Sequence, residues 1–286
     1  RPVVIGSGPA GLFCAYLLAL EGYRPLVLER GACVEERKKD VDRFWETGVL
    51  DTSSNVQFGE GGAGTFSDGK LNTLVKDKTG RNRFVLETFV KFGADEDILY
   101  AHKPHIGTDV LIDVVSKMRQ EIISLGGEFC FHTQVTDIDL NSKTLKVVHN
   151  MEDTSEDTIS AGAAVFAIGH SARDTFEMLY KHQIPMRAKS FAVGVRIEHP
   201  QTLIDHSQYG RDRGNDLPAA AYKLTENLDN GRGVYTFCMC PGGYVVNASS
   251  EEHRLAVNGM SYHDRSGENA NSAVIVTVTA DDFGSD

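Results

Sequence analysis

The chain has 286 residues, of which 41% are hydrophobic and 24% are charged, a composition typical of a globular protein with a buried core. Its 29 basic residues against 40 acidic ones give a formal charge of −11, which disfavours a nucleic acid or an anionic membrane as the main partner. Its apolar runs are shorter than the roughly 20 residues that cross a bilayer, and its first residues do not resemble a secretory signal. The five cysteines are scattered and odd in number, which favours a reducing compartment, so we expect a cytoplasmic protein.

The first thirty residues predict a strand, a glycine turn, a helix and a second strand. The short apolar run 2–5 leads directly into residues 6–11, whose sequence GSGPAG matches the pattern GxGxxG. Apolar residues cover a broad helix surface over 12–20, and Gly22 is a natural helix end. The second strand, 26–29, ends in an acid. This order is that of a dinucleotide-binding βαβ unit.

Each part of this motif has a physical purpose if the ligand is a dinucleotide. Gly6 permits the tight turn, Gly8 lets the backbone approach a pyrophosphate, and Gly11 allows helix and strand to pack closely. The phosphates would lie at the helix N-terminus, where Pro9 has no N–H to leave unsatisfied. Glu29 follows Gly11 by 18 residues, so its carboxylate can accept hydrogen bonds from ribose hydroxyls. The alternative is a glycine turn that binds nothing, which the placement of strand, helix and acid disfavours.

The GPAG sequence and the acid that ends the second strand resemble flavoproteins of the glutathione-reductase-like FAD/NAD(P)-binding superfamily. The resemblance implies FAD rather than NAD at this first site, a choice that the spacing alone leaves open. The cofactor contacts that it implies here are Gly6, Gly8, Pro9, Ala10, Gly11, Glu29 and Arg30.

Residues 33–58 are mostly polar, with a helical pattern. The charged run 35–40 predicts a solvated face, and Phe44 and Trp45 are expected to pack inward.

A glycine-rich stretch follows over residues 59–71. Residues 59–64 match GxGxxG, but no clear apolar strand precedes them and no amphipathic helix follows, so we do not predict a second nucleotide site. The stretch offers unencumbered N–H groups, and Thr65, Ser67 and Lys70 add donors suited to phosphate or a flavin edge. A flexible surface loop is the alternative.

Within this stretch, the sequence GGAGTFSDGKL narrows the resemblance. Together with residues 6–11 and the segment around Ala167, it is similar to the FAD-dependent or NAD(FAD)-utilizing dehydrogenases. In related flavoproteins a glycine-rich loop at this place lies against the pyrophosphate and flavin. The resemblance therefore implies Gly64, Thr65 and Lys70 as contacts.

The middle of the chain predicts helices over 84–92 and 109–125, followed by strands over 129–132 and 134–140. In the superfamily a strand residue after such a helix pairs its backbone with adenine, and Val135 is the matching position.

Residues 143–149 and 158–160 predict a small hairpin around the acidic turn 152–157. The apolar run 163–169 then predicts a buried strand. It resembles the second FAD-side motif of the superfamily, which implies that Gly169 lets the chain pass close to the cofactor; an ordinary core strand is the alternative.

Four stretches after residue 190 predict strands without long helices between them: 191–197, 233–238, 244–248 and 273–279. This texture suits an antiparallel sheet. The predicted fold class is therefore α/β, with a Rossmann-like FAD-binding domain around a central parallel sheet over 1–175. A mostly antiparallel β substrate domain is expected over 176–286.

Cys238 and Cys240 could form a redox pair or a soft metal site. Zinc needs further ligands, and no second Cys/His pair stands at metal spacing, so we predict an ordinary strand there and no metal site.

These observations favour an FAD-dependent oxidoreductase, a dehydrogenase acting on a small molecule. An isoalloxazine can accept a hydride itself, so catalysis need not require a side-chain nucleophile, and no catalytic residue is assigned. Lys70 and Arg196 are candidates only for orienting an anionic substrate or balancing charge on reduced flavin. Because the chain has no second strand-GxGxxG-helix unit, NAD(P)H is expected only as a transient electron donor.

Two other functions stay open at this point. One is a flavin-binding regulatory or scaffolding protein without turnover, and the other is a flavin-dependent RNA-modifying enzyme, which the charge of −11 disfavours. Arg1 stands almost inside the first strand, and the chain stops just after a strand. We therefore expect a further C-terminal segment, which in this superfamily returns to close over the flavin.

Overall fold

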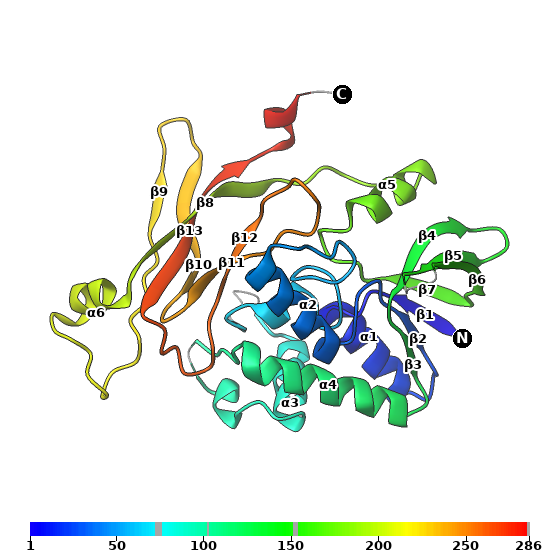
Figure 1. Ribbon diagram of the computed structural model, residues 1–286, viewed down its shortest axis with the longest axis horizontal. Coiled ribbons are helices and arrows are strands. Elements are labelled where there is room, and N and C mark those ends of the chain that lie inside the picture. The colour runs from blue at the N-terminus through cyan, green and yellow to red at the C-terminus, as the bar shows by residue number, and fades with distance from the viewer. Residues whose placement is uncertain (72–75, 102, 151–153, 285–286) are drawn as a thin grey trace. The chain divides into compact units, whose positions relative to one another are not determined.

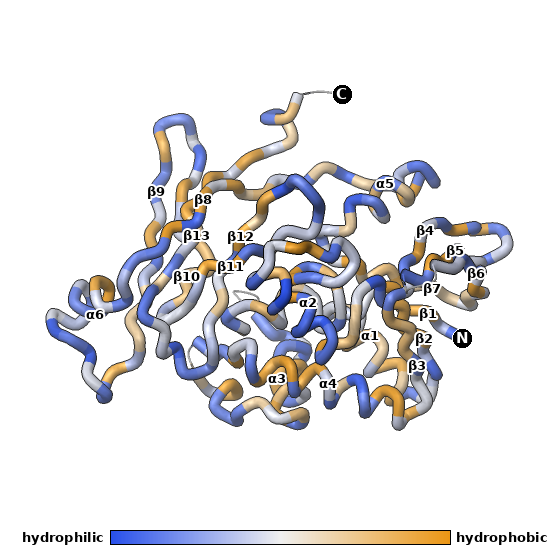
Figure 2. The backbone as a smooth tube through the Cα atoms, viewed as in Figure 1, coloured by the Kyte–Doolittle hydropathy of each residue, from blue (hydrophilic) through white to orange (hydrophobic). Residues whose placement is uncertain are grey.

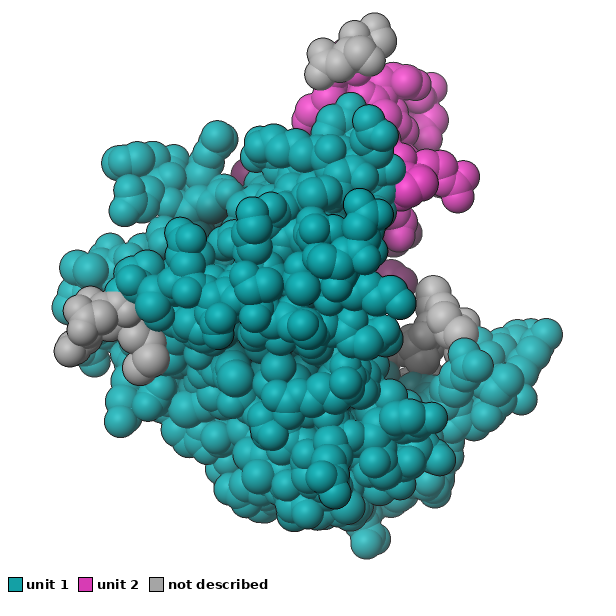
Figure 3. Space-filling model, turned by 90° about the vertical axis from the view of Figure 1, so that its right-hand side faces the viewer, with its two compact units in different colours: residues 1–184, 247–256 teal, residues 185–246, 257–286 magenta. Residues whose placement is uncertain are grey.

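The computed structural model describes residues 1–71, 76–101, 103–150 and 154–284 (Figure 1). These residues form two compact units, which Figure 3 distinguishes by colour. Unit 1 comprises residues 1–184 and 247–256, and unit 2 comprises residues 185–246 and 257–286.

The main helices and strands of unit 1 are β1 (Pro2–Ile5), α1 (Pro9–Leu20), β2 (Leu26–Leu28), α2 (Val34–Thr47), α3 (Arg81–Lys91), α4 (Thr108–Ser124), β3 (Glu128–Cys130), β4 (Thr133–Asp139), β5 (Thr144–His149), β6 (Ser155–Ser160), β7 (Ala163–Phe166) and α5 (Arg173–Lys181). Short 3₁₀ helices lie at Ala63–Phe66 and Glu96–Leu99. The expected strand–turn–helix–strand order of the first thirty residues is confirmed.

Four short parallel strands form the central sheet of unit 1 in the order β3-β2-β1-β7. Val4 of β1 pairs with Val27 of β2, and both side chains are fully buried. A parallel sheet that is covered on both faces needs apolar side chains at successive positions, which is why both strands read as unbroken apolar runs. The predicted central parallel sheet is confirmed.

Helices α1, α3 and α4 cover one face of this sheet (Figure 1). Val4 and Val27 pack there with Leu12 and Tyr16 of α1 and with Met118 of α4. The apolar spacing along α1 and α4 thus builds a core that holds the first turn of α1 against the end of β1.

A three-stranded antiparallel sheet, β4-β5-β6, and helix α5 cover the other face. Val3 and Leu28 of the central sheet pack there with Val135 of β4, Leu145 of β5 and Met178 of α5. Strand residues alternate between faces, so Val3 and Val4 belong to different cores.

Three predictions for this region differ from the structure. The run 163–169 is a strand only to Phe166, and its first three residues are exposed, because β7 is the edge strand of the sheet. Of the predicted acidic turn, residues 155–157 belong to β6, and 152 and 153 lie outside the described residues. The structure divides after Ile184, so the boundary predicted near residue 176 falls inside α5.

Unit 2 is mostly antiparallel sheet, as predicted. Its elements are β8 (Phe191–Pro200), α6 (Gln201–Tyr209), β9 (Thr225–Asn227), β10 (Gly233–Cys240), β11 (Tyr244–Asn247), β12 (Val257–Met260), β13 (Asn269–Val278) and a 3₁₀ helix at Ala280–Phe283. The sheet order is β8-β13-β10-β9, and β11 pairs with β12. The sequence did not predict α6, β9 or β12.

The expected strand at Cys238 and Cys240 is confirmed, but it is irregular. β10 shifts its register against β13 between Phe237 and Cys240, and Cys238 has a φ of 48°. Such a bulge turns side chains away from the regular alternation of a strand. Among the residues that the structure describes, no group of three or more His, Cys, Asp or Glu side chains is placed to hold a metal ion.

Candidate cofactor site

Two of the three motif glycines are required by the protein backbone itself. Gly6 has a φ of 95° and donates its N–H to the Leu28 carbonyl at 2.8 Å. A Cβ on Gly6 would lie 2.6 Å from the Ala167 carbonyl oxygen, and one on Gly11 would lie 1.9 Å from the Gly6 carbonyl oxygen. Any side chain at either position would therefore displace the turn that joins β1 to α1.

Gly8 is different, because nothing in the described protein demands a glycine there. Its φ of −65° suits any residue, and a Cβ would meet no atom closer than the Gly62 Cα at 3.8 Å. Pro9 and Ala10 beside it are exposed, and none of the described side chains caps this end of α1. The N–H groups of the first turn are thus open to an anion, which the helix dipole attracts.

The glycine-rich stretch packs directly against this turn. The Gly61 N–H donates to the Ser7 carbonyl at 2.9 Å, and a Cβ on Gly62 would lie 3.2 Å from both the Gly8 Cα and the Pro9 Cδ. This close approach explains the density of glycines that the sequence showed. Two segments that lie about fifty positions apart in the chain therefore share one site.

Two of the residues predicted in this stretch lie beside the turn in different environments. Gly64 is exposed, and no atom lies near a Cβ built on it. Thr65 is buried, and its hydroxyl has no hydrogen-bond partner among the described residues. A buried hydroxyl without a partner costs free energy, so Thr65 has an unused donor and acceptor for a ligand.

Glu29 fastens three backbone segments together. One carboxylate oxygen accepts from both the N–H and the hydroxyl of Ser7 at 2.8 Å, and the other accepts from the N–H groups of Gly31 at 3.0 Å and Gly59 at 3.1 Å. A carboxylate offers about four acceptor positions, so the protein uses all of them. The glycine turn and the Thr65 hydroxyl fit a bound pyrophosphate, whereas ribose hydroxyls reach Glu29 only by replacing protein donors.

Arg30 and Lys70, which were also predicted as cofactor contacts, form ion pairs within the protein. Arg30 forms an ion pair with Asp174 at 3.0 Å and stacks on Phe58 with its guanidinium carbon 4.3 Å from the ring centre. Lys70 pairs with buried Asp68 at 3.1 Å.

Val135 lies within β4, and Gly169 follows β7, two strands of unit 1 near the turn. Val135 is buried, and its backbone pairs with Val147 at the edge strand of the antiparallel sheet. The same strand begins beside Glu29, whose carbonyl accepts the Thr133 N–H at 2.7 Å. Gly169 has a φ of 69° and open space around it, three residues after β7 ends.

Arg196 of unit 2 is held by the protein. Its Nη2 donates to the Cys238 carbonyl at 2.6 Å, and its Nε donates to Asn271 Oδ1 at 2.7 Å. A Cβ on Gly259 would lie 1.9 Å from the same Nη2. These contacts give the guanidinium a structural role beside the bulge of β10.

A buried charge cluster that the sequence did not predict lies beside the glycine-rich stretch. Arg37 belongs to the run predicted as a solvated face, and α2 is mostly hydrophilic (Figure 2), yet Arg37 is fully buried. It donates to the carbonyls of Asn55, Val56 and Glu60 at 2.6–2.9 Å and so shapes the loop that leads into the glycines. Burial lowers the pKa of Arg37 to about 10, so it stays charged at neutral pH.

The spacing of residues along α2 indicates that Arg37 is buried. Val34, Arg37, Val41 and Phe44 recur at spacings of three and four, and all four are buried, as expected for one face of a helix. The prediction that Phe44 and Trp45 pack inward is confirmed, because Phe44 is buried and Trp45 packs on the core of Val41 and Phe66. The position of Arg37 on this helix face, and not its place in a charged run, therefore determines its burial.

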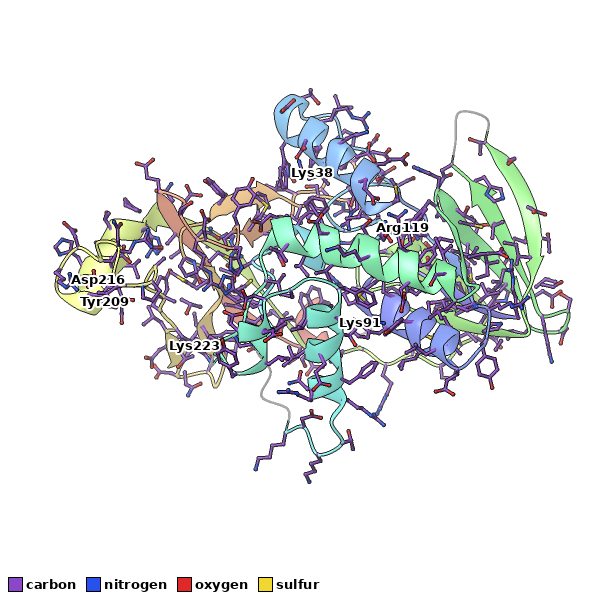
Figure 4. The ribbon with its side chains drawn as sticks, turned by 90° about the horizontal axis from the view of Figure 1, so that it is seen from below. Lys38, Lys91, Arg119, Tyr209, Asp216 and Lys223 are labelled. Atoms are coloured by element: carbon purple, nitrogen blue, oxygen red, sulfur yellow. The ribbon has the colours of Figure 1, made fainter. Side chains whose placement is uncertain are left out.

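Glu60 is the second charged member of the cluster. It is fully buried, and one carboxylate oxygen accepts the Val34 N–H at 2.8 Å. The other oxygen lies 3.0 Å from Nε of Arg119 on α4 (Figure 4), close enough for an ion pair but not aligned as a hydrogen bond. Burial raises the pKa of Glu60 to about 7 despite the opposing effect of Arg119.

Comparison with known protein families identifies the chain. Residues 1–183 match the family described as pyridine nucleotide-disulphide oxidoreductase, well over half of the sequence. The chain belongs to this family. Residues 190–286 match the family described as FAD-dependent protein, C-terminal domain-like, so the two matches meet near the division after Ile184.

An uncharacterised protein from Clostridium beijerinckii is 53% identical over 287 residues, which cover 99% of this chain and 52% of that protein. The chain thus spans about half the length of the curated relative it matches. Among solved structures, glycerol-3-phosphate dehydrogenase from Bacillus halodurans, complexed with FAD, is 12% identical with a TM-score of 0.46, over 92% of this chain and 48% of its own. A flavoprotein/dehydrogenase from Cytophaga hutchinsonii is 12% identical with a TM-score of 0.46, over 99% of this chain and 56% of its own.

The chain is a flavoprotein of this family, and its cofactor is FAD. The superfamily that the first motif suggested is confirmed, whereas the dehydrogenase family within it stays a prediction. A search of the described helices finds none that is both long and apolar enough to span a membrane.

Proposed function

We propose that the protein is an FAD-dependent dehydrogenase of a small-molecule substrate, with NAD(P)H able to deliver electrons transiently at the same flavin. The observation that carries the proposal is Gly8, a glycine that neither its backbone angle nor any described neighbour requires. It stands at an uncapped helix end, where a side chain would obstruct a diphosphate. When bound, FAD supplies hydride and single-electron chemistry.

The residues of unit 1 serve to bind and orient in this proposal. The first turn of α1 holds the pyrophosphate with its N–H groups, and the hydroxyl of Thr65 supplies a further polar contact. Glu29 holds Ser7, Gly31 and Gly59 in place, so it keeps the two glycine segments in register around that ligand. Gly64 and Gly169 leave open space at the edges of the same site.

The proposed partners are small molecules rather than a nucleic acid or a membrane, and the proposed location is the cytoplasm. The formal charge of −11 supports small-molecule partners, because a protein of this charge repels polyanions such as nucleic acids. The five free cysteines support a cytoplasmic location, because thiols persist in reducing compartments.

The substitution Gly8→Ala tests the cofactor site. We expect at least a tenfold loss of FAD affinity, about 1.4 kcal/mol, because the new methyl group occupies the approach of the pyrophosphate. Visible absorption of the purified protein and chromatography of the released flavin measure the FAD content. The stability of the folded variant should stay within about 0.5 kcal/mol of the wild type, since the site has room for a Cβ.

Gly233→Ala is the matched control. Gly233 begins β10, and a Cβ there would also meet no atom closer than 3.8 Å, the Thr277 hydroxyl. It should retain full FAD affinity. Equal FAD affinity in both variants would refute the proposed pyrophosphate site.

Anaerobic titration separates the enzyme from a flavin-binding scaffold. If the protein is a dehydrogenase, a panel of reduced metabolites that includes NADH and NADPH should bleach the bound flavin. Stable oxidised flavin with every member of the panel would instead favour a regulatory or scaffolding role.

A further inference from the structure

Unit 2 contains a cavity of about 630 Å³, and none of the residues described for the cofactor site lines it. Sheet residues Ile197, Val234 and Val274 and helix residue Ile204 of α6 line it. Its volume falls within the roughly 300–1,000 Å³ that is typical of sites for small organic molecules. All of its lining residues belong to unit 2, so its description does not depend on unit 1.

The sheet supplies an apolar wall because of its register. Val274 of β13 lies opposite Val195 of β8 on one side and Thr236 of β10 on the other. Directly opposed residues of an antiparallel sheet point to the same face. One face of three adjacent strands therefore presents branched side chains to the space beneath α6.

Buried polar bonds hold α6 in place at the other wall. The amide of Gln201 donates to Asp205 Oδ1 at 2.8 Å and to the Ala220 carbonyl at 3.0 Å, and its oxygen accepts the Gly242 N–H at 2.8 Å. Gln201 and Asp205 are both buried. Fully satisfied buried polar groups make a rigid anchor, so the cavity is formed before any ligand arrives.

Two polar side chains meet at the cavity wall. His199 Nδ1 lies 2.8 Å from the Ala270 carbonyl, and its Nε2 lies 2.9 Å from the Tyr222 hydroxyl. A carbonyl only accepts, so Nδ1 carries a proton, and in this tautomer Nε2 accepts the hydrogen bond of the Tyr222 hydroxyl. The Tyr222 oxygen retains two acceptor positions, one of which the Ser272 hydroxyl can fill, so one remains for a ligand.

The charge of the lining narrows the class of ligand. Glu226 is the acid among the lining residues, and no lysine or arginine belongs to them. Arg196 acts electrostatically on Tyr222, but its guanidinium donates to Cys238 and Asn271, so the lining offers an anion no ion-pair partner. Branched side chains on the wall and the rings of Tyr222 and Tyr235 favour a flat apolar molecule.

We propose that this cavity binds a small, uncharged, mostly aromatic molecule through one donor group, a hydroxyl or N–H that bonds to the Tyr222 oxygen. The inference goes beyond the proposed flavin chemistry and does not require it.

Calorimetric titration with 2-naphthol and with 2-methoxynaphthalene tests the site. The two probes share a ring system, but only 2-naphthol can donate a hydrogen bond. We expect 2-naphthol to bind the wild type more tightly, and Tyr222→Phe to weaken its binding by up to about tenfold while leaving 2-methoxynaphthalene unchanged. Absence of binding of both probes at millimolar concentration, or equal loss of both in Tyr222→Phe, would overturn the proposal.

Two tryptophan variants of α6 distinguish a blocked cavity from a misfolded protein. Ser207 is exposed on α6 and lines the cavity, so Ser207→Trp should block the entry of both probes with the fold intact. Leu203 is an exposed α6 residue that does not line the cavity, so Leu203→Trp should bind both probes like the wild type. Unchanged binding in Ser207→Trp would also overturn the proposal.

The Gly8→Ala variant keeps this inference distinct from the flavin site. It should lose FAD and retain its affinity for 2-naphthol, whereas Ser207→Trp should retain FAD and lose 2-naphthol. Either proposal can therefore fail while the other stands.

Discussion

Glu60 is a buried carboxyl group whose titration should set the pH dependence of stability near neutrality. Its pKa rises from an ordinary 4.5 to about 7 on folding, because burial disfavours the charged form. Its contribution to stability is therefore fully present below pH 4.5 and is lost as the pH rises through 7. The shift corresponds to about 3 kcal/mol. We expect the free energy of unfolding to fall between pH 5 and pH 8 in the wild type and to stay nearly level in Glu60→Gln, measured by urea denaturation.

Glu128→Gln is the control for this measurement. Glu128 is exposed at the start of β3, and the hydrogen bond from Arg1 lowers its pKa, so it titrates below the window of the experiment. This variant should keep the slope of the wild type. If Glu60→Gln also keeps that slope, the carboxyl group does not titrate near neutral pH in the folded protein.

Some residues of the site could be predicted from the sequence, whereas the burial of Arg37 and the hydrogen-bond donors to Glu29 could not. Gly6, Gly11 and Glu29 could be placed because GxGxxG specifies a local turn, and local geometry follows from nearby sequence. The burial of Arg37 could not be read from a charged run, since it depends on carbonyls of the loop 55–60 that fold back over α2. The sequence likewise did not reveal that Glu29 would bond four protein donors, because Gly59 reaches it from 30 positions away.

The turn between β1 and α1 is a structural element whose two outer glycines should respond differently from Gly8. In Gly11→Ala the Cβ would lie 1.9 Å from the Gly6 carbonyl oxygen, so helix and strand must separate. We expect destabilisation of about 3 kcal/mol, at the upper end of the cost of overpacking. Circular dichroism during chemical denaturation measures it.

Gly64→Ala is the matched substitution in the second glycine segment. A Cβ at Gly64 meets nothing within the described residues, so its stability should stay within about 0.5 kcal/mol of the wild type. Equal stability of the Gly11 and Gly64 variants would mean that the turn adapts without strain.

Whole elements were predicted best where their apolar period was long. The helix over 109–125 was found as α4, since five of its apolar residues share one buried face. β9 and β12 were missed because each has only three or four residues, too few to show a period of two. β7 was found but wrongly described as buried, because an apolar run of four does not distinguish a central strand from an edge strand.

On the scale of the molecule, the α/β class was predictable because the two halves of the chain have different successions of helices and strands. In the first part helices alternate with strands, which demands a parallel sheet with crossovers, and in the second part strands follow one another. The position of the division was not predictable, since α5 has the apolar face of an ordinary helix. The return of residues 247–256 to unit 1 is a long-range contact that no local pattern encodes.

The two units should also differ in local stability and in their response to FAD. The three hydrophobic clusters of the described residues all consist of unit 1 side chains, whereas Phe191, Val193 and Val195 of β8 are about half exposed or more. Backbone amides open most easily where few apolar contacts must be broken, so hydrogen exchange should be slowest in β1 and β2 and faster in β8.

A ligand that binds only the folded state adds about 2.7 kcal/mol to the free energy of unfolding at a hundred times its Kd. Saturating FAD should therefore slow exchange in β1 and β2 of the wild type far more than in β8. In Gly8→Ala the same FAD concentration should protect β1 and β2 less, since a tenfold loss of affinity removes about half of that stabilisation. Equal FAD protection of β1, β2 and β8 would contradict this assignment of the cofactor to the turn after β1.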